Sequence, residues 1–239
     1  MTRKTILITG ASAGIGAACA RLAAERGYDL YLNYNSDADG AEATAEAARA
    51  AGAQATVIQA DVSDPDAIGA MFEQIPRLDG LINNAGIVGQ TARLTDMDHA
   101  RLRQMFDVNV IGAMLVAKEA VLRMDKGAIV NVSSAAARLG SGNQYLDYAA
   151  SKAAIDTFTK GLSDEVAAQG IRVISVRPGI IDTEIHAKGG EPDRADRLAP
   201  MVPMKRKGSA QEVAEVILWL MSDQASYVTG TAIDVTGGR

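Results

Sequence analysis

The chain has 239 residues, of which 48% are hydrophobic and 22% charged, the balance of an ordinary globular protein. Its formal net charge of −5, without a dominant basic patch, argues against nucleic acid as a partner. The single cysteine, Cys19, excludes an internal disulfide, and the two isolated histidines, His99 and His186, predict no metal site. No apolar run approaches the roughly 18 residues of a membrane span, so we expect a cytoplasmic protein without membrane contact.

Apolar runs of strand length alternate with longer segments of helical period along the whole chain. The predicted strands are 5–9, 30–34, 56–59, 80–83, 128–132, 172–176 and 232–235. The predicted helices are 15–26, 41–51, 66–74, 100–124, 148–169 and 210–222. Because strand followed by helix recurs six times, we expect an α/β protein with a doubly wound parallel sheet of about seven strands and helices on both faces. No Pro- or Ser-rich linker divides residues 1–239, which are therefore predicted to form one domain.

A glycine-rich turn, Thr9-Gly10-Ala11-Ser12-Ala13-Gly14-Ile15-Gly16, connects the first predicted strand to the first predicted helix. Glycine lets the backbone turn sharply and approach a pyrophosphate closely, and the free N–H groups at the helix start attract its charge. In this strand–turn–helix context the motif predicts a dinucleotide-binding site. The residues predicted to bind the cofactor here are Gly10, Ser12, Gly14, Ile15 and Gly16.

Three more short motifs follow predicted strands, at the edge where open α/β sheets bind ligands. They are Asp61-Val62, Asn83-Asn84-Ala85-Gly86, and Arg177-Pro178-Gly179 with Ile181 and Thr183 after it. Together with the T-G-x-x-x-G-x-G turn they resemble the motifs of the short-chain dehydrogenase/reductase family, and the resemblance extends over nearly the whole chain.

This resemblance implies a Rossmann-like fold and a nicotinamide dinucleotide as cofactor. By resemblance, Asp61 meets the adenine ring, the Asn-Asn-Ala-Gly element stabilises the sheet near the adenosine, and the Pro-Gly element lies at the nicotinamide. The further cofactor-binding residues that it implies are Asp61, Val62, Asn84, Ala85, Gly86, Tyr148, Lys152, Pro178, Gly179, Ile181 and Thr183.

Tyr148 and Lys152 lie four residues apart at the start of a predicted helix, which puts them on one face. A free tyrosine titrates near pH 10, and we expect the Lys152 ammonium and an oxidised nicotinamide to lower the pKa of Tyr148 toward neutrality, so that it can act as acid and base. By resemblance, Ser134 is the catalytic serine that orients the substrate oxygen. It precedes Tyr148 by fourteen positions, where thirteen are usual, so we place an extra residue in the loop 139–146.

Asn109, in a predicted helix, matches the family's asparagine that anchors a water molecule in the proton relay. The resemblance therefore implies a fourth catalytic residue. An asparagine that merely kinks its helix is the alternative interpretation.

The end of the second predicted strand bears on the choice between NAD(H) and NADP(H). An NAD-preferring site places an acid there, and this chain has Tyr34, followed by Asn35 and Ser36 as donors to a phosphate. Asp29 precedes the predicted strand, and Asp37 comes slightly late. Tyr34, Asn35 and Ser36 are predicted to contact the cofactor, with NADP(H) favoured and NAD(H) as the alternative. Ala13 counts against NADP(H), since many NADP-preferring relatives carry Arg or Lys there.

Substrate selection is expected in the segments 87–94, 135–146 and 182–207, the last a long loop with a short helix. We expect a small-molecule carbonyl or alcohol substrate. His186 is interpreted as a surface residue and Lys205-Arg206-Lys207 as a solvated turn. The overall pattern, including residues 184–187 and 189–192, is most similar to bacterial glucose-dehydrogenase-like and 3-oxoacyl-carrier-protein-reductase-like members. By resemblance, the C-terminal segment and the long helices imply a homotetramer.

Two other functions compete with a short-chain oxidoreductase. An extended sugar-nucleotide epimerase would need a larger C-terminal domain and a different glycine spacing. A non-catalytic NADP(H)-sensing protein on the same fold would typically lack the Tyr or the Lys, whereas this chain keeps Ser134, Tyr148 and Lys152.

Overall fold

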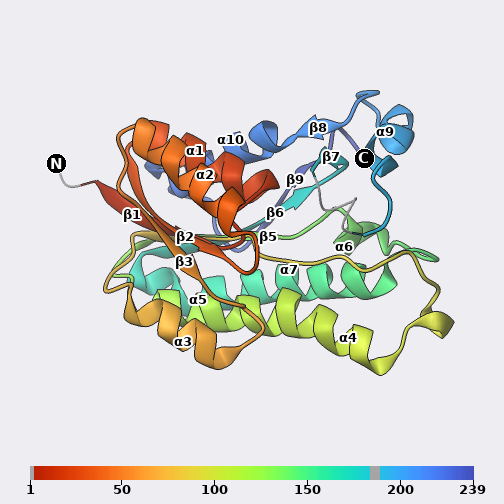
Figure 1. Cartoon of the computed structure of the whole chain (residues 1–239), viewed down its shortest axis with the longest axis horizontal. Helices are drawn as coiled ribbons and strands as arrows, with labels where there is room; N and C mark the ends of the chain where they lie inside the picture. The colour runs from red at the N-terminus through yellow and green to blue at the C-terminus, as the bar shows by residue number, and fades with distance from the viewer. Residues whose placement is uncertain (1–2, 184–188) are drawn as a thin grey trace.

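A computed structural model describes residues 3–183 and 189–239, and its centre is one parallel β-sheet (Figure 1). The strands lie in the order β3-β2-β1-β4-β5-β6-β9, and every neighbouring pair is parallel. The strands are β1 (Lys4–Ile8), β2 (Tyr28–Tyr34), β3 (Ala55–Gln59), β4 (Gly80–Asn83), β5 (Gly127–Val132), β6 (Ile171–Pro178) and β9 (Ala232–Val235). The predicted α/β fold with seven parallel strands is confirmed.

Helices cover both faces of the sheet, as Figure 1 shows. One layer holds α1 (Gly14–Glu25), α2 (Ala38–Ala50) and α10 (Ala210–Met221). The other holds α3 (Pro65–Glu73), α4 (His99–Phe106), α5 (Ala113–Val121) and α7 (Leu146–Val166). Two short helices, α6 (Ala136–Leu139) and α9 (Arg194–Leu198), lie near the carboxyl ends of the strands.

Alternating side chains along each strand feed two separate cores. On β1, Ile6 and Ile8 pack in the core under α1 and α10, whereas Leu7 packs in the core under α3 and α5. All three side chains are fully buried. Because successive strand residues point to opposite faces, a continuous apolar strand needs a helical layer on each side.

The sheet reverses its winding direction between β1 and β4. From β1 the chain adds β2 and β3 on one side, and then β4, β5, β6 and β9 on the other. Connections after β1 and β4 therefore diverge, which opens a crevice at the carboxyl ends of these two strands.

The predicted helix 100–124 is observed as an uninterrupted helical segment over 99–121 that is π-helical in its middle. A wider π-helical turn, Asp107–Gly112, separates α4 from α5. Within it Asn109 is buried, and a side chain at Gly112 would overlap the carbonyl oxygen of Val62. A π turn inside a helix is frequent at functional sites.

The segment 182–207 contains the predicted short helix, which is α9. The segment begins in a short strand, β7 (Ile181–Asp182), which pairs in parallel with β8 (Gly208–Ser209) directly after the segment. This two-stranded ladder ties both ends of the segment together beside the main sheet.

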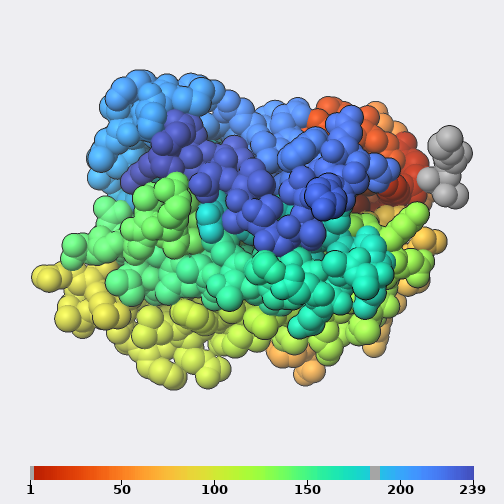
Figure 2. Space-filling model, turned by 180° about the vertical axis from the view of Figure 1, so that it is seen from behind, coloured from red at the N-terminus to blue at the C-terminus, as the bar shows by residue number. Residues whose placement is uncertain are grey.

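The C-terminal residues close one edge of the molecule. Figure 2 shows them in dark blue between the teal α7 layer and the lighter blue segment around residues 190–210. The Gly230 N–H donates to the Val173 carbonyl, and β9 pairs with the last half of β6. Across residues 3–183 and 189–239, no helix has the length and apolar character needed to cross a membrane.

Candidate active site

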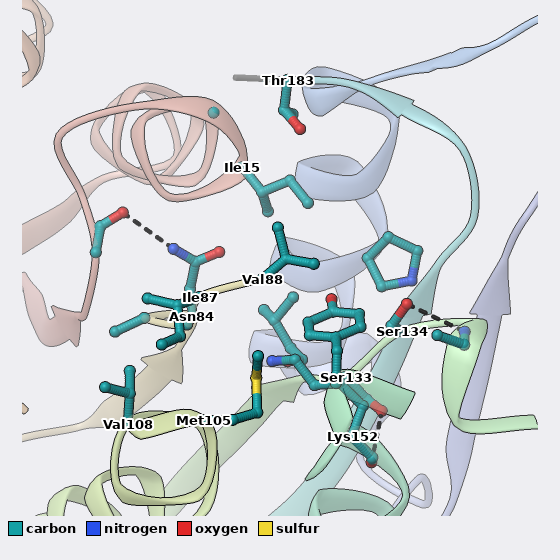
Figure 3. A pocket seen from close by; sticks show the side chains of 18 of the residues that line it. Ile15, Asn84, Ile87, Val88, Met105, Val108, Ser133, Ser134, Lys152 and Thr183 are labelled. Atoms are coloured by element: carbon teal, nitrogen blue, oxygen red, sulfur yellow. Dashed lines mark hydrogen bonds between the residues drawn. The ribbon is translucent and has the colours of Figure 1, made fainter. Parts of the chain in front are cut away.

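A pocket of about 720 Å³ lies along the carboxyl ends of the strands. Segments that follow β1, β2, β3, β4, β5 and β6 all contribute to its walls. Figure 3 shows Ile15 and Thr183 toward one side of it and Ser134 and Lys152 toward the other. The volume lies within the range of small-molecule and cofactor sites.

The glycine-rich turn forms the pocket wall between β1 and α1. Gly10 has a φ of +63°, which a side chain would strain, and a Cβ on Gly16 would overlap the carbonyl oxygen of Gly10 and lie 2.7 Å from Asn84 Nδ2. Asn84 Nδ2 in turn donates to the carbonyls of Thr9 (2.9 Å) and Gly10 (3.0 Å). The backbone is thus held close to the pocket without side chains in the way, which suits a pyrophosphate.

Most residues predicted to bind the cofactor line this pocket. Those that do are Gly10, Ser12, Gly14, Ile15, Asn35, Ser36, Asp61, Val62, Asn84, Ala85, Gly86, Tyr148, Lys152, Pro178, Gly179, Ile181 and Thr183. Two do not: Gly16, which packs behind the turn, and Tyr34. Asn33 and Asn35 line the wall on either side of Tyr34, because alternate strand residues share a face.

Two acids reach the pocket at the far end from Ser134. Asp61, after β3, accepts hydrogen bonds from the backbone and hydroxyl of Ser63, each at 2.8 Å. Asp37, after β2, caps α2 by accepting a bond from the Gly40 N–H at 3.0 Å. Asp29 lies inside β2 rather than before it, and pairs with Arg3 at 3.2 Å.

Ser134, Tyr148 and Lys152 come together between β5 and the start of α7. Ser134 and Tyr148 both line the pocket, and Ser134 Oγ accepts from the Ala136 N–H at 3.1 Å. Lys152 Nζ donates to the Val132 carbonyl at 2.8 Å and lies 5.8 Å from the centre of the Tyr148 ring. The neighbouring Ser133 hydroxyl donates to the Lys152 carbonyl at 3.0 Å, away from the pocket's reacting groups.

Burial shifts the pKa values of Tyr148 and Lys152 in opposite directions. Burial raises the pKa of Tyr148 above its usual 10, and the Ser134 hydrogen bond opposes the rise only in part. Burial also lowers the pKa of Lys152 to about 8, against the attraction of Asp156. Burial therefore favours the neutral form of each group.

Asn109 lies in the π turn and points toward the backbone of Ile87 rather than lining the pocket. Its Oδ1 accepts from the Ile87 N–H at 2.8 Å, and its Nδ2 donates to the Ile87 carbonyl and to Ser151 Oγ. A Cβ on Gly86 would lie 3.1 Å from Asn109 Oδ1 and 3.3 Å from Lys152 Nζ. The asparagine and the lysine therefore flank the same glycine.

Each segment expected to select substrate contributes to the pocket. The contributors are Ile87, Val88 and Gly89, then Ala135, Ala136, Leu139, Ser141 and Tyr145, and from the long loop Thr183 and Arg194. Sequence reasoning missed Arg101, Gln104, Met105 and Val108, which reach the pocket from α4 and the turn after it. Their three- and four-residue spacing was the available signal.

Lys205, Arg206, Lys207 and His99 are not among the residues that line the pocket. Lys207 pairs with Asp182 and Asp196, and Arg206 with Glu212, so the predicted solvated turn at 205–207 is tied to its neighbours. His99 begins α4, and His186 lies outside the described residues. Among the residues described, no three His, Cys, Asp or Glu side chains gather as metal ligands do.

Comparison with known proteins gives consistent matches over the full length. A family model described as enoyl-(acyl carrier protein) reductase matches residues 10–239. An oxidoreductase from Escherichia coli, YgfF, is 50% identical over 243 residues and covers 98% of either chain. Glucose 1-dehydrogenase 2 from Bacillus subtilis is 35% identical, covering 100% of this chain and 95% of its own. The solved structure of a short chain dehydrogenase from Burkholderia cenocepacia in complex with NADP has a TM-score of 0.90 at 31% identity, covering 99% of this chain and 97% of that one.

Proposed function

Because the chain belongs to the short-chain dehydrogenase/reductase family, we propose that it interconverts a small carbonyl compound and its secondary alcohol. Members of this family are NAD(P)-dependent oxidoreductases that act on CH–OH groups. The proposed catalytic residues are Tyr148, Ser134, Lys152 and Asn109. The observation that carries the proposal is the cluster of Ser134, Tyr148 and Lys152 in the pocket lined by the glycine-rich turn. The nicotinamide supplies or accepts the hydride.

Tyr148 transfers the proton. When the carbonyl carbon is reduced, the Tyr148 hydroxyl gives its proton to the carbonyl oxygen, and in the reverse direction tyrosinate removes it from the alcohol. The Ser134 hydroxyl holds the same oxygen. Ser134 Oγ already accepts the Ala136 N–H, so its own proton is available to the substrate.

Lys152 and Asn109 are proposed to assist this proton transfer. An ammonium has three donors, and Lys152 uses one on the Val132 carbonyl, which leaves two for the ribose hydroxyls of the cofactor. Positive charge there favours tyrosinate during the reaction. Asn109 fixes Ile87 beside Gly86 and completes a proton relay through a water molecule between itself and Lys152.

We further propose NADP(H) as the preferred cofactor, which the residues after β2 support. Asn35 and Ser36 line the pocket and can donate to a phosphate, and the N-terminus of α2 begins two residues later. The Asp37 carboxylate is used as the cap of α2. The structural relative from Burkholderia cenocepacia was solved with NADP.

A homotetramer is proposed from the family and from large apolar side chains that remain at the surface. Ile111, Met114 and Leu122, on the α4–α5 layer, are between 42% and 68% exposed. Such groups are typical of protein contacts. Light scattering of the purified protein at several concentrations measures the assembly, and a stable monomer would contradict the proposal.

The test of the function is cofactor titration followed by turnover. NADPH and NADH are titrated by their fluorescence, and ketones, aldehydes and sugars are then screened at the nicotinamide absorbance. We expect tighter NADPH binding and turnover that falls by at least about 10²-fold in Tyr148→Phe. Tyr227→Phe, at a fully exposed tyrosine, is the matched control.

Each outcome separates one part of the proposal from the rest. Tighter binding of NADH contradicts the cofactor preference alone. Cofactor binding without turnover on the whole panel favours a sensing protein. Absence of binding by either cofactor contradicts the oxidoreductase itself.

A further inference from the structure

Arg194 is a largely buried arginine among the residues that line the pocket. It lies on α9 in the long segment after β7, is 9% exposed, and lines the same pocket as Ser134 and Tyr148. Its Cζ lies 4.8 Å from the centre of the Tyr145 ring, and its Nη2 donates to Gln144 Oε1 at 2.8 Å. Two contacts therefore fix the plane of the guanidinium.

The other terminal nitrogen has no hydrogen-bond acceptor among residues 3–183 and 189–239. Arg194 Nη1 is buried, and its ion-pair partner, Glu191 Oε2, is 3.6 Å away, beyond hydrogen-bond distance. Glu191 does not move closer because its oxygens already accept from Thr91, Tyr145 and Arg197. A buried donor without an acceptor is costly, about 1–3 kcal/mol and more for a charged group, and such groups are rare in folded proteins.

The charges along the pocket favour a negative acceptor for this nitrogen. Asp37 and Asp61 are the acidic side chains among the described lining residues, and they follow β2 and β3. Ser134 follows β5, three and four strands away, or roughly 14 to 19 Å at about 4.8 Å per strand. Around Ser134, the end proposed for the substrate, the basic lining residues are Arg101, Lys152 and Arg194, and Arg239 lines the pocket as well.

Arg101 does not compete for the same ligand. Its Nε and Nη2 both donate to the carboxylate of Asp147, at 2.8 and 3.3 Å, and the Asp147 side chain is fully buried. Lys152 is held at the Val132 carbonyl beside Tyr148. Arg194 is thus the cation at this end with a buried, uncommitted donor in the described part of the chain.

We propose that Arg194 Nη1 binds a carboxylate of the substrate, so that the enzyme acts on oxo acids and the corresponding hydroxy acids. The turnover of oxo acids rests on the proposed function, whereas the binding of a carboxylate at Arg194 does not. Stacking on Tyr145 and the bond to Gln144 hold the guanidinium in place before the ligand arrives, so little conformational freedom is lost on binding. A charge-assisted hydrogen bond to a carboxylate then satisfies the free donor.

The first experiment measures binding without turnover. Non-reacting carboxylates, from acetate to octanoate and including cyclohexanecarboxylate, are titrated by calorimetry into the protein saturated with its nicotinamide cofactor, beside the uncharged amides of the same acids. We expect at least one carboxylate to bind at least tenfold more tightly than its amide, and Arg194→Gln to remove this difference. Arg194→Lys keeps a charge without the planar fork and is expected to retain part of it.

Arg197→Gln is the matched control. Arg197 lies one turn further along α9 and pairs with the same Glu191, but it does not line the pocket and is 58% exposed. Its loss is expected to leave the preference for carboxylates within about twofold. If the substitutions acted only by weakening α9, Arg194→Gln and Arg197→Gln would reduce the preference for carboxylates over amides to the same extent.

The second experiment compares oxo acids with their methyl esters as substrates, with the carboxylate two to five bonds from the ketone. We expect kcat/KM to favour the acid, and Arg194→Gln to lower the ratio of acid to ester at least tenfold. Equal binding of acids and amides by the unaltered protein overturns the inference, as does an unchanged ratio in Arg194→Gln. Carboxylate binding that depends on Arg194, with no turnover of any compound, supports the inference and contradicts the proposed reaction.

Discussion

The proposed cofactor end and the proposed substrate end of the pocket are held by different kinds of contact. At the cofactor end, backbone atoms approach closely around Gly10 and Gly16, and Asn84 fastens them to the loop after β4. At the substrate end, the contacts join side chains such as Arg101 and Asp147, or Arg194 and Gln144, from elements 46 to 50 residues apart. A cofactor shared by many enzymes is recognised by a fixed backbone, and a substrate by exchangeable side chains.

Asp147→Ala tests the substrate end with the largest expected effect on stability. The Asp147 side chain is fully buried and Arg101 is 20% exposed, so removing the carboxylate leaves a largely buried guanidinium without its partner. We expect the free energy of unfolding to fall by about 3 kcal/mol in urea titrations. Asp107→Ala breaks the exposed pair with Arg103 and is expected to cost less than about 1 kcal/mol. Equal losses in the two variants would contradict the distinction.

Lys152→Met tests the effect of burial on Lys152 by the pH dependence of the free energy of unfolding. Burial lowers the pKa of Lys152 from 10.5 in the unfolded chain to about 8 in the folded one. Between these values the unfolded chain binds more protons, so Lys152 makes the folded state more stable as pH rises, by up to about 1.4 kcal/mol per pH unit. The unfolding free energy of the unaltered protein is therefore expected to gain on that of Lys152→Met from pH 8 to pH 10. Parallel curves would be inconsistent with a depressed pKa.

Gly16→Val tests whether the backbone alone shapes the cofactor end. The new side chain would overlap the Gly10 carbonyl and displace Asn84 Nδ2. We expect the dissociation constant of the cofactor, measured by fluorescence, to rise at least about 100-fold, which corresponds to roughly 2.7 kcal/mol. Gly69→Ala, at an exposed position of α3 with nothing within 4 Å of the new methyl group, should leave cofactor binding unchanged and raise stability by about 0.5–1 kcal/mol.

Asn84→Ala sharpens the same point with a smaller change. It removes the hydrogen bonds to the Thr9 and Gly10 carbonyls but leaves the turn free of new atoms. We expect cofactor binding to weaken by about tenfold, or about 1.4 kcal/mol, since neutral hydrogen bonds contribute about 1 kcal/mol each. An effect on substrate KM larger than on cofactor binding would place Asn84 at the wrong end of the pocket.

The α/β fold and the glycine-rich turn at the pocket were predictable from sequence because their signals are local. The strand–turn–helix pattern around Gly10 specifies both conformation and chemistry within eight residues, and the predicted strands recur in the sheet as β1 to β6 and β9. The family was confirmed by a family model that matches residues 10–239 and by a relative that is 50% identical over 243 residues. Tyr34 was the weak point, because strand alternation turns Asn33 and Asn35, rather than Tyr34, toward the pocket.

Only the tertiary structure decided the substrate end and the protonation of the site. Nothing near Arg194 in the sequence indicates that Tyr145 and Gln144 will bury it, and the spacing around Asn109 did not reveal a π turn in a helix predicted as continuous. The burial that raises the pKa of Tyr148 could not be predicted for the same reason. Local backbone preferences and motif spacing are written in consecutive residues, whereas burial, and with it the electrostatic environment of a side chain, depends on which distant segments pack around it.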